Sequence, residues 1–207
     1  MSYEAGVTTV LAVRLILASG SPRRRELLEE LGLSPEVRPA NIDETPLPGE
    51  VAAAYVERLA IEKGAAVVAL GDIEPGDVVV SADTIVVLDG DLLGQPENDN
   101  SARAMLEALS GRTHDVLTGV AVRTDQAVTS VVETTVVHFA ELSSNDIDWY
   151  IATGEPADKA GAYALQGRGG AFVTAIEGSY DNVIGLPRHR IRHLLPLGAE
   201  WDESAAD

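Results

Sequence analysis

The chain has 207 residues, of which 45% are hydrophobic, and this is enough to bury the core of one domain. Its 33 acidic residues outnumber 15 basic ones and give a net charge of −18, a field that repels nucleic acid and anionic membranes. The sequence has no cysteine, which excludes disulfide bonds and thiolate catalysis. We therefore expect neither nucleic acid nor a membrane as a partner.

No apolar run has the length of a membrane span. The apolar stretch 7–18 contains Arg14 and lacks a basic leader, so we do not interpret it as a signal peptide and we expect a cytoplasmic protein. Of the 15 basic residues only Lys63 and Lys159 are lysines. A GC-rich genome with an acidic surface is one explanation of this composition; we favour adaptation to a salty cytoplasm, where carboxylate repulsion is screened.

Helical and strand patterns alternate along the chain, which predicts an α/β fold. In order, the patterns predict a strand at 14–18, helices at 22–31 and 50–70, a strand at 78–88 and a hairpin into residues 92–93. A helix at 100–109, paired strands at 116–122 and 131–139, and a helix from Ser143 to Ile151 follow. Short strands or turns then lead to a last helix at 187–195. We expect one domain over 14–196, with 1–13 as an N-terminal extension and 197–207 as an acidic tail.

The first candidate for chemistry is the stretch from Ser19 to Arg25, where a strand enters a turn of small residues. Ser21 suits the N-cap and Pro22 the first helical position, so free backbone N–H groups are available to an anion. Arg23 and Arg24 follow one turn above the buried leucines, whereas Arg25 faces Glu29 as a surface pair. A capped surface helix with solvated arginines explains the pattern too, but we favour a phosphate site.

Lys63 extends the inward stripe of the second helix, because it lies four residues beyond Leu59. An ammonium group there either reaches solvent along its stem or meets an anion. In a chain that otherwise uses arginine, a compact point charge for phosphate is a reason to keep lysine. The same reasoning applies, more weakly, to Lys159.

Asp83 lies inside the strand-like run 78–87, where a carboxylate is disfavoured and costly to bury without a partner. One interpretation is a structural aspartate that caps a turn or pairs with an arginine. The other is a general base or metal ligand at a cleft. The pair Asp43-Glu44, in the loop 41–49, offers another carboxylate, and Mg²⁺ typically uses one or two of these together with substrate phosphates.

Two other patterns receive little weight. The run Gly167-Arg168-Gly169-Gly170 lacks the lysine that a phosphate loop needs. His189 and His193 stand four residues apart, a spacing that suits a metal, but the arginines around them favour a solvated helix face.

Taken together, the segments between about Leu15 and Leu195 resemble the Maf family of nucleoside triphosphate pyrophosphatases, once described as septum-formation inhibitors. The matching pieces are residues 15–24, 43–45, 58–60 with 62–63, 82–86, 109–111 with His114, 118–120, 158–163, 166–167 and 185–187. The resemblance implies an elongated mixed β-sheet flanked by helices, with two lobes around a central nucleotide cleft. It also implies hydrolysis of a triphosphate to the monophosphate and pyrophosphate.

The resemblance assigns roles to individual residues. Asp83 would be the general base for water attack on the α-phosphorus, and Glu44 with Asp83 would bind Mg²⁺ or Mn²⁺. The residues expected to hold the substrate are Ser19, Arg23, Arg24, Lys63, Thr84, Lys159 and Gln166. Family members of the 7-methyl-GTP type differ at Arg23, Thr84 and Gln166. Since the Gln166 amide can both donate to a carbonyl and accept from N3–H, we expect dTTP and UTP as preferred substrates.

One departure is Gln95, where family members commonly carry lysine, and Arg103 is a candidate to replace the missing cation. Two alternatives stay open. One is a house-cleaning pyrophosphatase for modified pyrimidine nucleotides, and the other is a nucleotide-binding regulator of cell division with incidental hydrolysis. Whether the chain forms a homodimer also stays open.

Overall fold

The computed structural model describes residues 14–196, so the extension 1–13 and the tail 197–207 lie outside the described residues. The strands are β1 (Leu15–Leu17), β2 (Glu36–Val37), β3 (Val78–Leu88), β4 (Asp91–Leu93), β5 (Thr113–Arg123), β6 (Val128–Phe139) and β7 (Val173–Glu177). The α-helices are α1 (Pro22–Glu29), α2 (Ala52–Ala69), α3 (Asp99–Leu109), α4 (Ser144–Ile151), α5 (Tyr180–Ile184) and α6 (Arg188–Leu194). Three 3₁₀ turns, η1 (Glu155–Asp158), η2 (Ala160–Ala162) and η3 (Arg168–Phe172), lie between α4 and β7.

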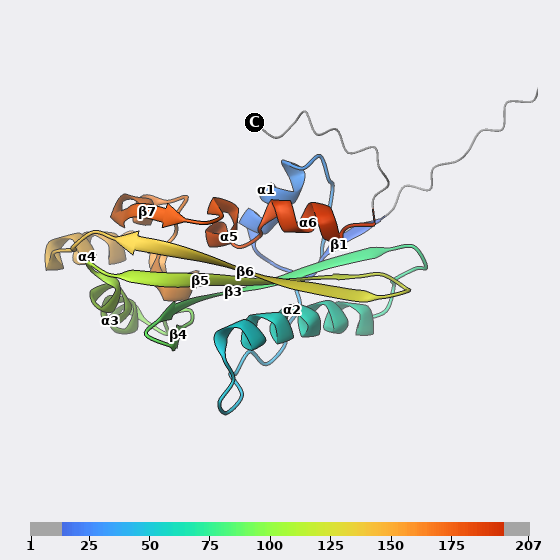
Figure 1. Cartoon of the computed structure of the whole chain (residues 1–207), viewed down its shortest axis with the longest axis horizontal. Coiled ribbons are helices and arrows are strands. Elements are labelled where there is room, and N and C mark those ends of the chain that lie inside the picture. The colour runs from blue at the N-terminus through green and yellow to red at the C-terminus, as the bar shows by residue number, and fades with distance from the viewer. Residues whose placement is uncertain (1–13, 197–207) are drawn as a thin grey trace, which may run out of the picture.

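The predicted α/β class is confirmed, since the strands form one seven-stranded mixed sheet with helices on both faces (Figure 1). The long predicted elements agree with the observed ones to within a few residues. The two-residue strand β2 and the short helix α5 were not predicted, because neither is long enough to show a hydrophobic period. The division into two lobes stays a prediction.

The sheet follows the order β2-β1-β3-β5-β6-β7, with β4 also paired to β3. β3 pairs with β5 along almost its whole length, from Val79 to Val87. On its other side β3 has two short partners, because β1 covers Val78–Val80 and β4 covers Val86–Leu88. Residues 81–85 of β3 therefore lie at an open stretch of sheet edge. Since side chains of a strand alternate between faces, residues from both faces border this gap.

Two helical layers enclose the sheet, with α2 and α3 on one face and α1, α5 and α6 on the other (Figure 1). α2 packs its fully buried Val56 and Leu59 against β3 and β5. It approaches β5 closely at Gly119, where any Cβ would collide with the backbone carbonyl of Val56. On the opposite face Leu27 and Leu28 of α1 join the core formed with Val80 and Leu186. These contacts fix the depth of both helices on the sheet.

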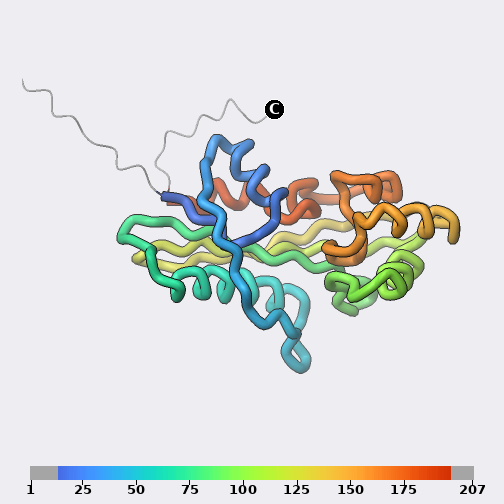
Figure 2. Tube along the Cα trace, turned by 180° about the vertical axis from the view of Figure 1, so that it is seen from behind, coloured from blue at the N-terminus to red at the C-terminus, as the bar shows by residue number. Residues whose placement is uncertain are grey.

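The chain passes from one layer to the other beside the gap in the sheet. Figure 2 shows the segment between β2 and α2 crossing the edge of the sheet from the α1 side to the α2 side.

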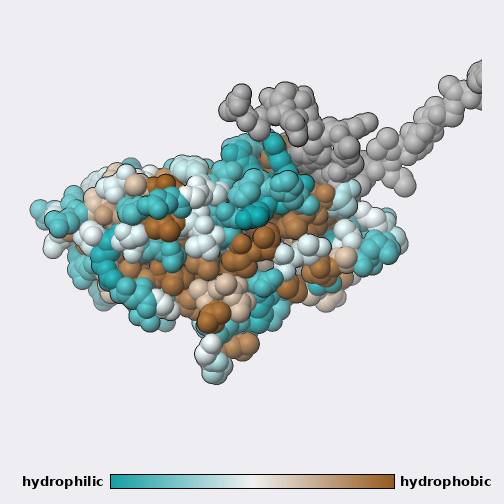
Figure 3. Space-filling view, viewed as in Figure 1, coloured by the Kyte–Doolittle hydropathy of each residue, from teal (hydrophilic) through white to brown (hydrophobic). Residues whose placement is uncertain are grey.

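On the face in Figure 3, hydrophilic residues gather over α1 and α6. Within residues 14–196, none of the helices combines the length and apolar character that crossing a bilayer requires.

Candidate active site

A pocket of about 470 Å³ lies at the gap in the β3 edge. All the residues that the sequence analysis assigned to the site line this pocket: Ser19, Arg23, Arg24, Glu44, Lys63, Asp83, Thr84, Lys159 and Gln166. They come from the turn after β1, from α1, α2 and β3, from the loop between β2 and α2, and from the segments around η1 to η3, so only the tertiary structure brings them together. Gln95 also lines the pocket. Arg103 does not, because it pairs with Asp148 of α4, so it cannot replace the missing cation.

The centre of the pocket is an ion-pair group of Asp83, Lys63 and Glu44. The Lys63 Nζ donates to Asp83 Oδ1 at 2.7 Å and lies 2.8 Å from Glu44 Oε1. Lys63 is 8% exposed, so its ammonium meets anions rather than reaching solvent. The anions are two carboxylates of the protein itself. Asp83 is 6% exposed, and its Oδ2 accepts no hydrogen bond from residues 14–196.

The loop that carries Glu44 is tied to α2. The Tyr55 hydroxyl donates to the backbone carbonyl of Glu44 at 2.9 Å. Arg58 donates twice to Glu50, at 2.7 and 2.8 Å, and also reaches the carbonyl of Thr45. The Arg58 hydrogen bonds lower the pKa of Glu50 to about 2, so this pair stays charged at neutral pH. α2 therefore positions both Lys63 and the Glu44 backbone.

Arg24 connects three segments of the pocket wall. Its Nε donates to the carbonyl of Gly185 at 2.9 Å, and its two terminal nitrogens donate to Ser19 Oγ and Thr84 Oγ1, both at 3.0 Å. Burial lowers the pKa of this guanidinium, and nearby carboxylates oppose that shift. A guanidinium has five N–H groups. Three N–H groups of Arg24 thus bind the protein, and two remain available to a ligand.

The direction of the hydrogen bond between the Thr84 and Thr118 hydroxyls is fixed. The Thr118 hydroxyl donates to the carbonyl of Asn182 at 2.9 Å, so it can only accept in its 2.9 Å hydrogen bond with Thr84. A hydroxyl has one proton and two lone pairs. Because Thr84 uses its proton on Thr118 and one lone pair on Arg24, it can offer a ligand only an acceptor.

Arg23, Gln166 and Lys159 border the outer part of the pocket. The Arg23 side chain has no hydrogen-bond or ion-pair partner within residues 14–196, and its Nε is buried without one. Gln166 is exposed, and its amide likewise has no partner in the described part of the chain. Lys159 pairs with the neighbouring Asp158. Two of these three groups are therefore free to bind a ligand without first breaking a contact.

The chain matches the model of a known protein family. A family model described as "Maf-like protein" matches residues 14–197. The chain belongs to the Maf family. A Maf relative from Anaeromyxobacter sp. (strain Fw109-5), named dTTP/UTP pyrophosphatase, is 55% identical over 200 residues, covering 93% of this chain and 94% of the relative. A relative of the same name from Shewanella denitrificans is 49% identical over 195 residues, covering 91% and 98%.

Among solved structures, the Ham1 protein of Staphylococcus aureus is similar to this Maf chain with a TM-score of 0.44. The identity is 16%, over 62% of this chain and 72% of that one. A similarity this low supports no conclusion about the site.

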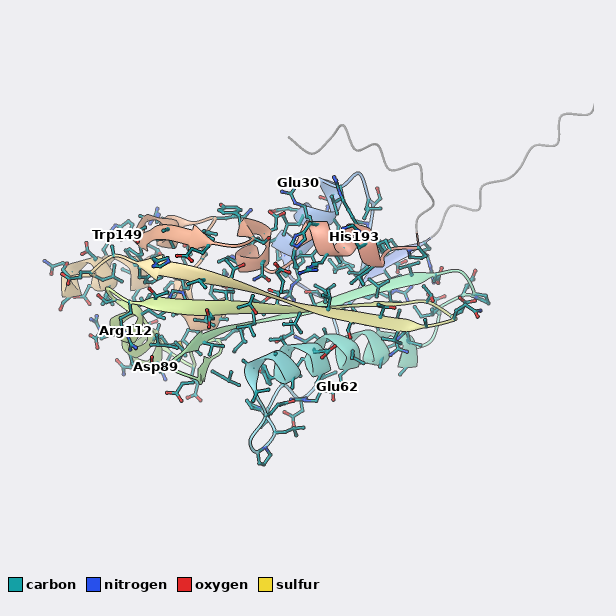
Figure 4. The ribbon with its side chains drawn as sticks, viewed as in Figure 1. Glu30, Glu62, Asp89, Arg112, Trp149 and His193 are labelled. Atoms are coloured by element: carbon teal, nitrogen blue, oxygen red, sulfur yellow. The ribbon has the colours of Figure 1, made fainter. Side chains whose placement is uncertain are left out.

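Several residues of the Maf site were not recognised in the sequence. Thr118 and Asn182 orient Thr84, and Gly185 binds Arg24 through its carbonyl. The segments around Thr118 and Gly185 carried the family resemblance, but nothing in their composition indicated these contacts. Glu155 and Tyr150, which hold the loop around Gln166, were missed as well. His189 and His193 are both exposed on α6, as expected for a solvated face (His193 is labelled in Figure 4).

The pocket also has the donors for a divalent cation. Asp83 and Glu44 present two carboxylates on one ammonium ion, so a positive charge is already stabilised between them. No group of three or more potential metal-binding side chains exists within residues 14–196. This donor set suits Mg²⁺, which usually takes one or two carboxylates and completes its shell with phosphate oxygens and water.

Proposed function

We propose that this Maf-family chain is a cytoplasmic enzyme that hydrolyses dTTP and UTP to the monophosphate and pyrophosphate. The observation that carries the proposal is the convergence on one pocket of a buried carboxylate, Asp83, with cations in a chain of net charge −18. The curated relatives named dTTP/UTP pyrophosphatase support it, since they cover most of the chain.

Asp83 is the general base of the proposed reaction. Lys63 binds Oδ1 and so fixes the plane of the carboxylate, which leaves Oδ2 to take a proton from water. The water oxygen forms a bond to the α-phosphorus as the bond from that phosphorus to the leaving pyrophosphate oxygen breaks. Lys63 has three N–H groups and two carboxylate neighbours, so one N–H remains for a phosphate oxygen.

The triphosphate is bound by the cations around Asp83. Arg23 has a full set of donors without protein partners, and Arg24 has two N–H groups left beside Ser19. Lys159 exchanges its contact with Asp158 for a phosphate oxygen. Fixed donors that face the charge on the phosphates stabilise the transition state without reorganisation.

A divalent cation, Mg²⁺ or Mn²⁺, would be held by Asp83 and Glu44. When bound, it neutralises charge on the phosphates and orients them. In the structure the Lys63 ammonium bridges the same two carboxylates, so a bound cation and Lys63 would share Asp83 and Glu44. Glu44 is the more adaptable ligand, because its side chain is 52% exposed.

Gln166 and Thr84 read the base. Uracil and thymine present a carbonyl beside an N3–H donor, and the Gln166 amide complements both. Thr84 offers only an acceptor, so its oxygen can share the single N3–H proton with the Gln166 oxygen in a bifurcated hydrogen bond. Cytosine lacks this donor and would leave an acceptor unpaired, at a cost of about tenfold to a hundredfold in kcat/KM.

The test is steady-state hydrolysis of a panel of triphosphates with Mg²⁺ or Mn²⁺, in water enriched in a heavy oxygen isotope. We expect dTTP and UTP to exceed CTP and 7-methyl-GTP, with the label in the monophosphate. Label in pyrophosphate, or orthophosphate as the first product, would place the attack on another phosphorus. A preference for CTP or 7-methyl-GTP would disprove the assignment of Gln166 and Thr84.

A further inference from the structure

The carboxylate of Glu155 lies inside a ring of hydrogen-bond donors behind the pocket. Its Oε1 accepts from the Tyr150 hydroxyl at 2.8 Å and from the Gly169 N–H at 3.1 Å, and its Oε2 accepts from the Arg168 N–H at 3.0 Å. The Tyr150 oxygen in turn accepts from the Ala164 N–H at 3.0 Å. Glu155 and Tyr150 thus bind both ends of residues 164–169, which we call the Gln166 loop.

The glycines of this loop are required by the contact. A Cβ on Gly167 would collide with the Glu155 carboxylate, and a Cβ on Gly169 would lie 2.5 Å from the Tyr150 oxygen. Gly167 has φ −112°, which any residue adopts, so close approach is the reason for glycine here. The glycine-rich run that resembled a poor phosphate loop therefore wraps its backbone amides around a carboxylate of the protein itself.

The Glu155 carboxylate acts as a hydrogen-bond acceptor for the loop. Burial by itself raises its pKa, but the N–H groups of Arg168 and Gly169 and the Tyr150 hydroxyl bring the pKa below its usual value. The group is thus an acceptor at neutral pH with three donors already bound. Tyr150 is fully buried. The side chain of Arg168, within the loop, lies over the ring of Trp149 of α4, 5.8 Å from the ring centroid (Trp149 is labelled in Figure 4).

Gln166 stands at the middle of this anchored loop. Its side chain is exposed, lines the pocket and has no partner in the described part of the chain, so only its backbone fixes where the amide points. We propose that Glu155, through Tyr150 and the loop amides, is a positioning residue that sets base discrimination by preorganising Gln166. This inference rests on the proposed function, because it concerns how the same pocket distinguishes bases.

The test is a double-mutant cycle on the ratio of kcat/KM for UTP to that for CTP. Glu155→Gln replaces one acceptor oxygen with a donor that faces a backbone N–H, and Tyr150→Phe removes the link to Ala164. We expect each to lower the ratio by about tenfold, the scale of a misplaced contact group. In a Gln166→Ala background, Glu155→Gln should change the ratio no further. Glu107→Gln, an exposed acid on α3, is the matched control and should leave the ratio unchanged.

Two results would overturn the proposal. One is an equal loss on UTP and CTP in Glu155→Gln, and the other is a further fall of the ratio in the Gln166→Ala background. Hydrogen exchange at the amides of Arg168 and Gly169 provides a readout that does not depend on activity. Exchange at these amides should accelerate in Glu155→Gln whether or not the unmodified chain hydrolyses UTP and CTP. If the unmodified chain hydrolyses neither triphosphate, that absence of activity would disprove the proposed function alone. Unchanged exchange would show that Glu155 does not hold the loop.

Discussion

Lys63 Nζ lies 2.7 Å from Asp83 Oδ1, and the pair connects α2 to the exposed edge of β3. Lys63 and Asp83 are buried, at 8% and 6% exposed, and each is a counter-charge for the other. Removing one partner of such a pair leaves an uncompensated buried charge, which costs far more than the pair contributes. The pair therefore links the stability of the fold to the arrangement of the pocket.

The first prediction concerns Asp83→Asn. The amide keeps an oxygen for Lys63, so the fold should persist while kcat falls by about two to four orders of magnitude, the range for loss of a general base. The measurements are kcat for dTTP and the circular dichroism spectrum. Asp89→Asn is the matched control, because Asp89 directly follows β3 with a positive φ that Asn also tolerates, and within residues 14–196 its side chain pairs only with Arg112 (Figure 4). Near wild-type turnover in Asp83→Asn would remove Asp83 from the mechanism.

The second prediction concerns Lys63→Met, which leaves Asp83 and Glu44 facing each other without a cation. We expect the free energy of unfolding to fall by about 3 kcal/mol, as for a broken buried pair. Adding Asp83→Asn should restore part of that loss, since it removes the stranded charge. Urea unfolding of the single and double variants measures both effects. Strictly additive losses would show that the two residues are not coupled.

The third prediction concerns Thr118→Val, which removes the acceptor that fixes the Thr84 hydroxyl. Thr84 can then rotate its proton toward a ligand and accept cytosine as well as uracil. The ratio of kcat/KM for UTP over CTP should fall by up to about tenfold, the worth of one unpaired polar group. Thr118→Ser keeps the hydroxyl and should keep the ratio. An unchanged ratio in Thr118→Val would mean that Thr84 does not read the base.

The fourth prediction concerns pH. His114 is 3% exposed, its Nε2 lies 2.9 Å from the Tyr163 hydroxyl, and burial lowers its pKa from 6.5 to about 4. The unfolded chain therefore binds this proton first as the pH falls, so stability is lost between about pH 6.5 and 4, with a slope of up to about 1.4 kcal/mol per pH unit. His114→Gln should flatten the curve of unfolding free energy in this window. His138→Gln, at a more exposed site, is the control, and the same slope in wild type and His114→Gln would contradict the assignment.

The fifth prediction tests the halophilic interpretation of the −18 charge. Repulsion among carboxylates is screened as the Debye length falls to about 3 Å at 1 M salt. The melting temperature should rise from low salt toward molar KCl, while KM for dTTP worsens because phosphate attraction is screened too. NaCl at equal ionic strength is the control for a specific potassium effect. A melting temperature that is flat or falls with KCl would disprove adaptation to salt and leave the proposed enzyme function intact.

The sequence by itself determined the local structure and the types of residue at the site. Periodicity located the long helices and strands, and the inward position of Lys63 and the buried position of Asp83 followed from the apolar patterns around them. Only the tertiary structure decided what these residues contact. The pairing of Lys63 with Asp83, the three bonds of Arg24 and the anchoring of the Gln166 loop all join residues distant in sequence or depend on loop backbone. No periodic pattern encodes such contacts, since they depend on where two short strands leave an edge of the sheet uncovered.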